Sequence, residues 1–329
     1  MINTDFPKFD LGFLPTPLVE LKNLSKYLSG PHIFMKRDDM TGLAFGGNKT
    51  RKLEYLLGEA LFGGYDTLIT GGAEQSNHCR QTAAAAAFAG LECHLVLSGN
   101  PPDDFNGNLL LNRLCKAQIH WAGDFRKGET IPSVAEDLRS KGKKPYTIPY
   151  GGSNVTGALG FVEAAEELSI QMSEKKLRFD RIVFASSSGG THAGLMVGAE
   201  IYGLDSEITG IAIDKEGLEE GTFGKMILDL TNETALKLDI SKVFTNNDII
   251  LKNGYTGNGY GVAGKLEKEA ISLLASLEGV FLDPVYTGRA MGGLIDMIRK
   301  KEITEKERVL FWHTGGTPAL FSYAFELMK

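Results

Sequence analysis

The 329-residue sequence predicts an α/β protein with two doubly wound open sheets. Short runs rich in β-branched and aromatic residues alternate with amphipathic or alanine-rich stretches of about 10 to 18 residues, which is typical of parallel sheets covered by helices on both faces. Eight such runs over this length fit two sheets better than one. Many of the 40 glycines directly follow these runs, where open α/β sheets bind their ligands.

The strand candidates follow one another along the whole chain. They are HIFMKRDD (32–39), DTLITGG (66–72), ECHLVLS (92–98), AQIHWAG (117–123), KPYTIPY (144–150), DRIVFAS (180–186), EITGIAI (207–213) and RVLFWHT (308–314). QTAAAAAFAGL (81–91) predicts a closely packed helix, because alanine is small and the best helix former. The helical stretch at 262–278 has a charged face that we expect to be solvated.

The segment FGGNKTRKLEYLLGEA (45–60) predicts a helix that starts with basic residues. Apolar residues at helical spacing mark its buried face: Leu53, Leu56, Leu57, Ala60 and Leu61. Lys49 falls within roughly 50° of the centre of this face, whereas Arg51 lies on the opposite side. Lys49 is therefore a candidate for a buried amine, the alternative being a lysine that extends to the surface.

The composition excludes several classes of function. A net charge of −6 argues against nucleic acid or an anionic membrane as the main partner, so any site for an anionic ligand must be a local feature. The first 21 residues lack the pattern of a signal peptide, and no apolar run reaches the roughly 18 residues of a membrane span. Cys79, Cys93 and Cys115 form no CxxC pair, which indicates free thiols in a reducing compartment. We expect a cytoplasmic protein.

A strand, a polar turn and a helix are predicted over 180–203. The turn contains Ser186, Ser187, Ser188, Gly189, Gly190 and Thr191. Its N–H groups and hydroxyls, together with the positive end of the helix, suit a single phosphate. The dinucleotide pattern GxGxxG fails, because Thr191 stands where the second glycine should be, and a P-loop lysine is missing. Asp214 ends the next strand and keeps a nicotinamide-dependent enzyme as an alternative. A further alternative is that the glycines only allow close packing of the helix on the strand.

A second strand–turn–helix unit, at 66–84, carries Gln75, Ser76, Asn77 and His78 at its turn. Capping of the helix by Ser76 or Asn77 would explain one polar residue but not four, so we favour a ligand-binding role. YGGSNVTGALGF (150–161) repeats the pattern more weakly. His78, His192 and His313 lie near loops without metal-ligand spacing, and we expect satisfied structural histidines and no metal site.

Two late segments, FLDPVYTGRAMGGL and VLFWHTGGTPALF, each place a polar turn after an apolar run. Tyr286, Thr287 and Thr314 lie at these turns, and Tyr286 is a candidate for stacking on a ligand or for core packing. A buried lysine, a phosphate cup, polar loops and an aromatic ring together are what pyridoxal phosphate requires. Desolvation near a positive helix end would lower the pKa of Lys49 and favour a nucleophilic amine.

At these residues the sequence resembles the D-cysteine desulfhydrase / 1-aminocyclopropane-1-carboxylate deaminase family of fold-type II pyridoxal-phosphate enzymes, which have the tryptophan synthase β-like architecture. The resemblance covers nearly the whole chain. Its motifs are LPTPLVEL, KRDDMTGLAFGGNKTRKLEYL, EQSNHCRQTAA, SSSGGTHAGL, DPVYTGRAMGGL and HTGGTPALF.

The resemblance implies a role for each site residue. Lys49 would bind pyridoxal 5′-phosphate covalently and shuttle the α-proton of a small amino-acid substrate. Lys52 and residues 187–191 would hold the phosphate, and Asn77 would bond the 3′-oxygen of the pyridine ring. The loop from Gln75 to His78, with Ser76 among the catalytic residues, would receive the substrate carboxylate. Tyr286 would stack on the cofactor ring, and Tyr260 would be a second active-site tyrosine.

Two residues separate the subfamilies. Deaminases carry Glu after the stacking tyrosine and Leu after the histidine of the HxGG turn, whereas this chain has Thr287 and Thr314, as the D-cysteine desulfhydrases do. A carboxylate near the pyridine nitrogen keeps it protonated and makes the ring a strong electron sink, which the opening of a carbon–carbon bond requires. Sulfide is a good leaving group and tolerates the weaker sink that a neutral hydroxyl leaves. The resemblance therefore implies a carbon–sulfur lyase that converts D-cysteine to pyruvate, sulfide and ammonia.

Two other lyase activities are alternatives to the cleavage of D-cysteine. One is an aminocyclopropane-carboxylate deaminase, which releases 2-oxobutanoate and ammonia, and the other is a lyase for another β-substituted amino acid. A nicotinamide-dependent oxidoreductase is disfavoured by the failed fingerprint, and a non-catalytic relative would require the loss of a catalytic residue. The resemblance also implies a homodimer. It further implies a large cofactor-binding domain of residues 1–52 and 156–329, interrupted by a small domain of residues 53–155.

Overall fold

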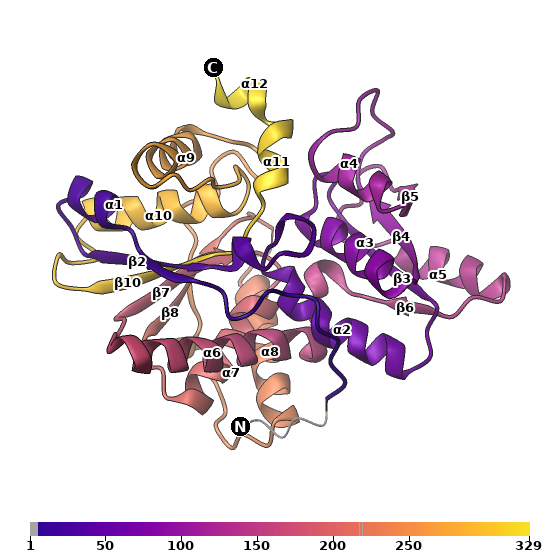
Figure 1. The fold of residues 1–329 in the computed structure, drawn as a ribbon, viewed down its shortest axis with the longest axis horizontal. Helices are drawn as coiled ribbons and strands as arrows, with labels where there is room; N and C mark the ends of the chain where they lie inside the picture. The colour runs from indigo at the N-terminus through magenta and orange to yellow at the C-terminus, as the bar shows by residue number, and fades with distance from the viewer. Residues whose placement is uncertain (1–5, 217, 219) are drawn as a thin grey trace.

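Two separate sheets organise the chain, of which the computed structural model describes residues 6–329 apart from 217 and 219 (Figure 1). The larger sheet has the strand order β1 (Leu18–Glu20), β2 (His32–Arg37), β10 (Arg308–His313), β7 (Arg181–Ser186), β8 (Glu207–Ala212) and β9 (Ile250–Lys252). The smaller sheet has the order β5 (Gln118–Trp121), β4 (Glu92–Leu97), β3 (Thr67–Gly72) and β6 (Pro145–Thr147). Paired strands run parallel except β1 and β2, so the predicted α/β class with two open sheets is confirmed.

Each strand candidate of the sequence contains a strand of the structure, from β2 to β8 and β10. The strands that had no candidate, β1 and β9, have three residues each, too few to show a period. Two candidates extend too far. After β2 the chain turns into a 3₁₀ helix at Asp38–Met40, and β6 ends at Thr147, before another 3₁₀ helix at Tyr150–Gly152.

The larger sheet is covered on both faces. Val183, Ile211 and Phe311 face a core that also includes α1 (Lys22–Tyr27), α9 (Lys265–Glu278) and α10 (Thr287–Arg299). The neighbouring residues Ile182, Phe184 and Leu310 face the opposite core. That core is closed by α6 (Val155–Lys175), α7 (Gly190–Tyr202) and α8 (Thr222–Lys237). Successive side chains therefore serve opposite faces, as the period of a strand requires.

The smaller sheet is covered in the same way. Leu68, Cys93 and Leu95 pack against α2 (Lys49–Phe62), α3 (Asn77–Ala89) and α4 (Gly107–Leu114). Ile69 and Val96 face α5 (Ile131–Ser140). The chain ends with α11 (Thr317–Ser322) and α12 (Ala324–Leu327). The predicted domain boundaries fall inside α2 and within the first turn of α6, and they stay a prediction.

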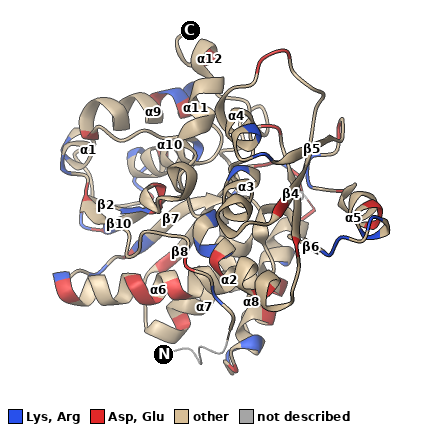
Figure 2. Cartoon of the chain, turned by 45° about the vertical axis from the view of Figure 1, so that its right-hand side comes forward, with Lys and Arg blue, Asp and Glu red and all other residues tan. Residues whose placement is uncertain are grey.

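The helix α2, which begins with Lys49, is tied to the larger sheet by a buried ionic network. Arg51 is 1% exposed and donates to the carboxylates of Asp38 and Glu167, the latter on the acidic helix α6 (Figure 2). Trp312 of β10 donates from Nε1 to Asp38 at 2.8 Å. Arg51 does lie opposite the apolar face of α2, yet its charge is buried against these partners.

The prediction that the first 21 residues are no signal peptide falls partly on residues that the structure does not describe. The first five residues lie outside the described residues. Within the part of the chain that the structure describes, no helix combines the length and the apolar character that crossing a membrane requires.

Candidate active site

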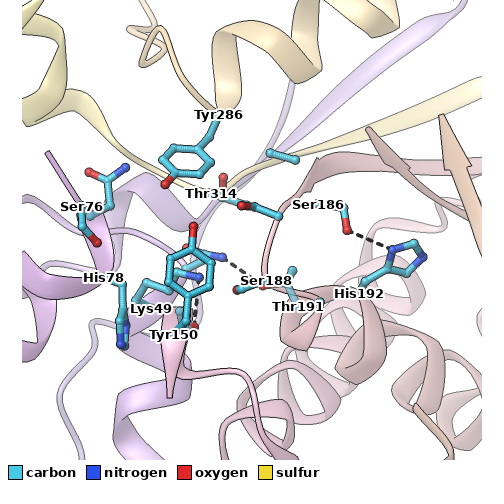
Figure 3. A pocket seen from close by; sticks show the side chains of 16 residues that line it. Lys49, Ser76, His78, Tyr150, Ser186, Ser188, Thr191, His192, Tyr286 and Thr314 are labelled. Atoms are coloured by element: carbon cyan, nitrogen blue, oxygen red, sulfur yellow. Dashed lines mark hydrogen bonds between the residues drawn. The ribbon is translucent and has the colours of Figure 1, made fainter. Parts of the chain in front are cut away.

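A pocket lies between the two sheets, beyond the carboxyl ends of β3, β6, β7 and β10 (Figure 3). We call it the Lys49 pocket. Its walls are formed by Asn48, Lys49, Ser76, Asn77, His78, Tyr150, Gly151, Ala185, Ser186, Ser187, Ser188, Gly189, Thr191, His192, Tyr286 and Thr314. Parallel sheets place ligands at this edge, and here two such edges face each other.

Lys49 begins α2 and extends into the pocket, where Nζ donates a hydrogen bond of 3.1 Å to the carbonyl oxygen of Gly151. Gly47 allows this approach: its φ is +131°, and a Cβ there would lie 2.5 Å from Nε2 of Gln81. Burial lowers the pKa of Lys49 to about 8. A larger fraction of this amine is neutral at pH 7 than in an exposed lysine, which suits a nucleophile.

Lys52 is fully buried one helical turn further on. Its Nζ donates to the carbonyl oxygen of Gly151 and to Oγ of Ser153, both at 3.1 Å. A Cβ on Gly190 would lie 2.8 Å from this Nζ, so the amine sits directly against the loop of residues 187–191. Burial, and then the neighbouring charge of Lys49, lower the pKa of Lys52 well below its usual value.

The loop 187–191 leads into the first turn of α7, whose N–H groups have no partner within the helix. Ser153 donates to Oγ of Ser188 at 2.7 Å and accepts from the N–H of Gly190 at 3.1 Å. Asn48 donates to Oγ1 of Thr191 at 3.0 Å. The glycines of close helix packing lie elsewhere, at Gly194 and Gly198, where a Cβ would clash with α6. The loop therefore offers donors and a positive helix end beside Lys52.

The start of α3 supplies the opposite wall. Ser76 is its N-cap and accepts from the N–H of Cys79 at 3.2 Å, so capping accounts for this hydroxyl in part. Oδ1 of Asn77 accepts from Arg80 and Asn108 at 3.0 and 2.9 Å. Because the oxygen is engaged in this way, the amide N–H groups of Asn77 are its available donors toward the pocket.

The two histidines of the pocket wall, His78 and His192, were expected to have both ring nitrogens hydrogen-bonded, but each has only one. Nε2 of His78 bonds Oγ1 of Thr70 at 3.0 Å, and Nδ1 of His192 bonds Oγ of Ser186 at 3.2 Å. The second ring nitrogen of each is buried without a partner. Burial lowers the pKa of His192 to about 3, and burial followed by the two lysines lowers the pKa of His78 well below its usual value. Both rings are neutral at pH 7. His313 is satisfied by Phe281 and Gly315, as expected.

Tyr286 faces Lys49 and Tyr150 across the pocket (Figure 3). Its hydroxyl is hydrogen-bonded to that of Tyr260, and the two rings meet edge to face with centroids 6.0 Å apart. Burial raises the pKa of both hydroxyls well above the usual value, so both are protonated at pH 7. Tyr260 thus reaches the pocket only through Tyr286.

Most of the predicted site residues form the wall of this pocket, and five do not. Lys52 bonds Gly151 of the wall and adjoins Gly190, and Tyr260 is bonded to Tyr286. Gln75 and Thr287 lie away from the pocket. Oε1 of Gln75 accepts from the N–H of Asn108 at 2.9 Å, and Thr287 donates to Oδ1 of Asp283 at 2.7 Å. Neither is part of the pocket wall, whereas Thr314 is. Asp214, which the nicotinamide alternative required, pairs with Arg126.

The sequence analysis gave no ligand-binding role to three wall residues, Asn48, Ala185 and His192. It had placed Ser186 in the predicted phosphate turn, and Tyr150 and Gly151 in the weaker YGGSNVTGALGF pattern. Asn48, Ala185 and His192 reach the wall through the fold rather than through a local pattern.

The donor chemistry of the pocket fits pyridoxal phosphate. Lys52 is a fully buried amine whose hydrogen bonds go to neutral oxygens, beside a helix start rich in N–H and hydroxyl groups. This arrangement is suited to a phosphate. Lys49 offers the amine for the aldehyde, Asn77 offers N–H donors, and Tyr286 offers an aromatic ring.

Comparisons with known proteins agree with this chemistry. The family described as "Pyridoxal-phosphate dependent enzyme" matches residues 9–315. The chain is 45% identical over 326 residues to the D-cysteine desulfhydrase of Salmonella newport (strain SL254), with 97% of each chain covered.

Solved structures show the same fold. The "ACC deaminase homologue" superposes with a TM-score of 0.90 at 38% identity, covering 98% of this chain and 96% of the other. The T.th. threonine deaminase superposes with a TM-score of 0.65 at 18% identity, covering 92% of each chain, and supports the fold alone.

Proposed function

Because the chain belongs to the family of pyridoxal-phosphate dependent enzymes, we propose that it is a lyase that eliminates sulfide from D-cysteine. The protein is an enzyme of the fold-type II class, its cofactor is pyridoxal 5′-phosphate, and its substrate is a small molecule. The resemblance drawn from the sequence motifs is thereby confirmed.

The observation that carries the choice of substrate is the absence of an acidic wall. Among the residues that the structure describes, no Asp or Glu lines the Lys49 pocket, and Thr314 stands at the turn after β10. Thr287 is bound to Asp283 and brings no carboxylate to the pocket either. A neutral environment for the pyridine nitrogen favours loss of a good leaving group such as sulfide over the opening of a carbon–carbon bond. The relative named for D-cysteine desulfuration supports the same choice.

Lys49 is proposed to hold the cofactor and to take the proton from Cα of the substrate, because its amine lies inside the pocket with a lowered pKa. When bound, pyridoxal phosphate supplies an electron sink for the charge left at Cα. Lys52 and the loop 187–191 are proposed to hold the phosphate. These residues fix the position of the reacting carbon relative to Lys49.

The start of α3 and the tyrosines are proposed to complete the site. The N–H groups and hydroxyl at Ser76 to His78 lie at the pocket wall and suit the substrate carboxylate. Tyr286, protonated and bonded to Tyr260, covers the site from the other side. In total, D-cysteine and water give pyruvate, hydrogen sulfide and ammonia. The Cα–H, Cβ–S and Cα–N bonds break, the oxygen of water becomes the keto oxygen of pyruvate, and Cβ becomes its methyl group.

The decisive experiment compares two substrates. Purified holoenzyme receives D-cysteine in one assay and 1-aminocyclopropane-1-carboxylate in the other, and the released 2-oxo acid is identified. We expect pyruvate with an equal amount of sulfide from D-cysteine, and no 2-oxobutanoate from the cyclic substrate. Release of 2-oxobutanoate would support the deaminase activity, the second candidate, which the similarity to the ACC deaminase homologue favours. L-Cysteine serves as the control for stereopreference.

We also propose that the enzyme is a cytoplasmic homodimer. Large apolar side chains are exposed on two segments that touch each other: Phe13, 77% exposed, packs on Gly42, and Phe45 is 67% exposed three residues later. An exposed apolar surface of this kind is typical of an interface between subunits. Free Cys79 and Cys93, both buried, are compatible with a reducing compartment. Light scattering coupled to gel filtration tests the dimer, which Phe45→Ser should weaken.

A further inference from the structure

Arg80 is a fully buried cation that forms no salt bridge with any residue that the structure describes. Its three hydrogen bonds go to neutral oxygens: Oδ1 of Asn77 at 3.0 Å, Oδ1 of Asn108 at 2.7 Å and the carbonyl oxygen of Gly46 at 2.6 Å. Its Nε has no partner. Burial lowers the pKa of this guanidinium to about 9, and the charge of Asp283, which makes no salt bridge with Arg80, offsets the effect of burial only in part.

The other fully buried arginines show what Arg80 lacks. Arg51 pairs with Asp38 and Glu167, and Arg289 pairs with Glu267 at 2.6 Å. A buried charge without a counter-ion is costly, so proteins normally supply one. The described part of the chain places no carboxylate in a salt bridge with Arg80, although Asp283 acts on it from further away. Arg80 is separated from the Lys49 pocket by a single side chain, that of Asn77.

We propose that Arg80 is a positioning residue for the cofactor, and that the anionic 3′-oxygen of the pyridine ring is its counter-ion, reached through Asn77. Two effects act together. Arg80 and Asn108 occupy the amide oxygen of Asn77, which turns the amide N–H groups toward the pocket. The positive charge of Arg80 polarises that amide and stabilises negative charge at the oxygen that it binds.

The position of Arg80 also couples the parts of the site. The carbonyl oxygen of Gly46 precedes the turn to Lys49, Asn108 lies in the first turn of α4, and Asn77 begins α3. The guanidinium of Arg80 thus joins the loop before Lys49 to Asn77, the residue proposed to bond the cofactor ring. This inference uses the cofactor, which the family establishes, and is independent of which amino acid is cleaved.

The first experiment measures the bound cofactor rather than turnover. In Arg80→Gln holoenzyme the pH midpoint of the cofactor's visible absorption change should rise by about one unit, because removal of a nearby cation raises the pKa of the titrating group. Arg80→Lys keeps the charge and should stay near the wild-type midpoint, whereas the dissociation constant of pyridoxal phosphate should increase at least about tenfold in Arg80→Gln. Equal midpoints for wild type and Arg80→Gln, both folded by circular dichroism, would overturn the inference.

A second variant protects the test against simple misfolding. Asn77→Asp places a carboxylate next to Arg80 and gives it the counter-ion that it lacks. The cofactor-free variant should therefore melt at a higher temperature than the wild type while binding pyridoxal phosphate more weakly. A lower melting temperature, or unchanged affinity for the cofactor, would contradict the proposal. Loss of D-cysteine turnover alone would leave these readouts unaffected, so the two proposals fail separately.

Discussion

Lys49 and Lys52 donate hydrogen bonds to the same acceptor, the carbonyl oxygen of Gly151, each at 3.1 Å. Two ammonium groups at one neutral oxygen repel each other, and burial removes the water that would screen them. Burial is the larger cause of the lowered pKa of both amines, which for Lys49 falls to about 8, and the charge of Lys49 lowers the pKa of Lys52 further. The repulsion between these two amines therefore destabilises the cofactor-free protein, and binding of an anionic ligand would reduce it.

The first prediction concerns the stability of the cofactor-free protein. Lys49→Met should abolish turnover yet raise the free energy of unfolding at pH 7, by about 3 kcal/mol at most for a pKa lowered from 10.5 to about 8. Between pH 8 and 10.5 the unfolded chain binds the proton that the folded chain has released, so wild-type stability rises with pH in this window. The advantage of Lys49→Met should therefore be largest below pH 8 and vanish near pH 10.5 in urea titrations.

A surface lysine provides the control. Lys8 pairs with Glu54 and Glu163, which together raise its pKa despite partial burial. Lys8→Met should lower the free energy of unfolding by about 1 kcal/mol, because Lys8 and Glu163 are partly exposed although Glu54 is buried. If Lys49→Met destabilises the cofactor-free protein at pH 7, the buried amine does not carry the electrostatic cost that the geometry indicates.

Local sequence patterns predicted the strands and the loops of the site because both depend on near neighbours. Ser76, Ser187 and Thr314 each follow a β-rich run closely, and parallel strands bring such positions to one edge. Lys49 was placed inward by the spacing of the leucines that follow it in α2. The antiparallel strand β1 was not predicted, because three residues are too few to show the alternation of a strand.

The residues that the sequence did not predict act over long separations. Arg80 meets Asn108, and Arg51 meets Glu167 across 116 positions, and neither partner is marked by a motif. The sequence predicted the same cofactor-binding role for Thr287 and Thr314. In the structure the hydroxyl of Thr287 donates to Asp283 at the start of α10 instead. Such competition between partners is decided by packing, which a single sequence does not encode locally.

The second prediction concerns the network behind α2. Arg51→Met leaves the fully buried Asp38 without its cation and should lower the free energy of unfolding by about 3 to 5 kcal/mol. Burial alone would raise the pKa of Glu167, but Arg51 and then Lys36 lower it to about 2, so this part of the stability is lost only as pH falls from about 4.5 to 2. Arg299→Met breaks an exposed pair with Glu269 and should cost less than about 1 kcal/mol. Equal losses in urea unfolding would refute the network's role.

The third prediction concerns the contact between the loop after β5 of the smaller sheet and the loop after β8 of the larger sheet. Arg126, from the segment after β5, pairs with Asp214 and Glu216 beyond β8 and lies 4.7 Å from the ring centroid of Tyr260. Arg126→Gln removes the ion pairs and the cation–π contact with Tyr260. Without that contact, Tyr260 holds the hydroxyl of Tyr286 less rigidly in place. We expect KM for D-cysteine to rise about three- to tenfold with a stability change below about 1 kcal/mol. Lys127→Gln, which removes only the pair with Glu216, should leave KM near the wild-type value.

The last prediction concerns the size of the substrate side chain. Tyr150 lines the Lys49 pocket and also an outer cavity of about 550 Å³ whose walls include Lys127, Phe223 and Met226. The carbonyl oxygen of Gly151, which follows it, is held by two lysines, so the backbone at Tyr150 is fixed. Tyr150 lies on the wall that the two spaces share, together with Ser187 and Ser188, and its ring belongs to the lining of the Lys49 pocket in Figure 3.

Removing this ring should admit larger β-substituents. In Tyr150→Ala the ratio of kcat/KM for S-benzyl-D-cysteine to that for D-cysteine should rise at least about tenfold, whereas Tyr150→Phe should keep the ratio within about threefold. Met226 lines the outer cavity but not the Lys49 pocket, so Met226→Ala is the control and should not change the ratio. Because turnover of D-cysteine is itself a proposal, the affinities for D-alanine and D-phenylalanine, read from the cofactor absorption, give the same comparison without catalysis. An unchanged preference for D-alanine in Tyr150→Ala would show that another residue limits the space around the substrate.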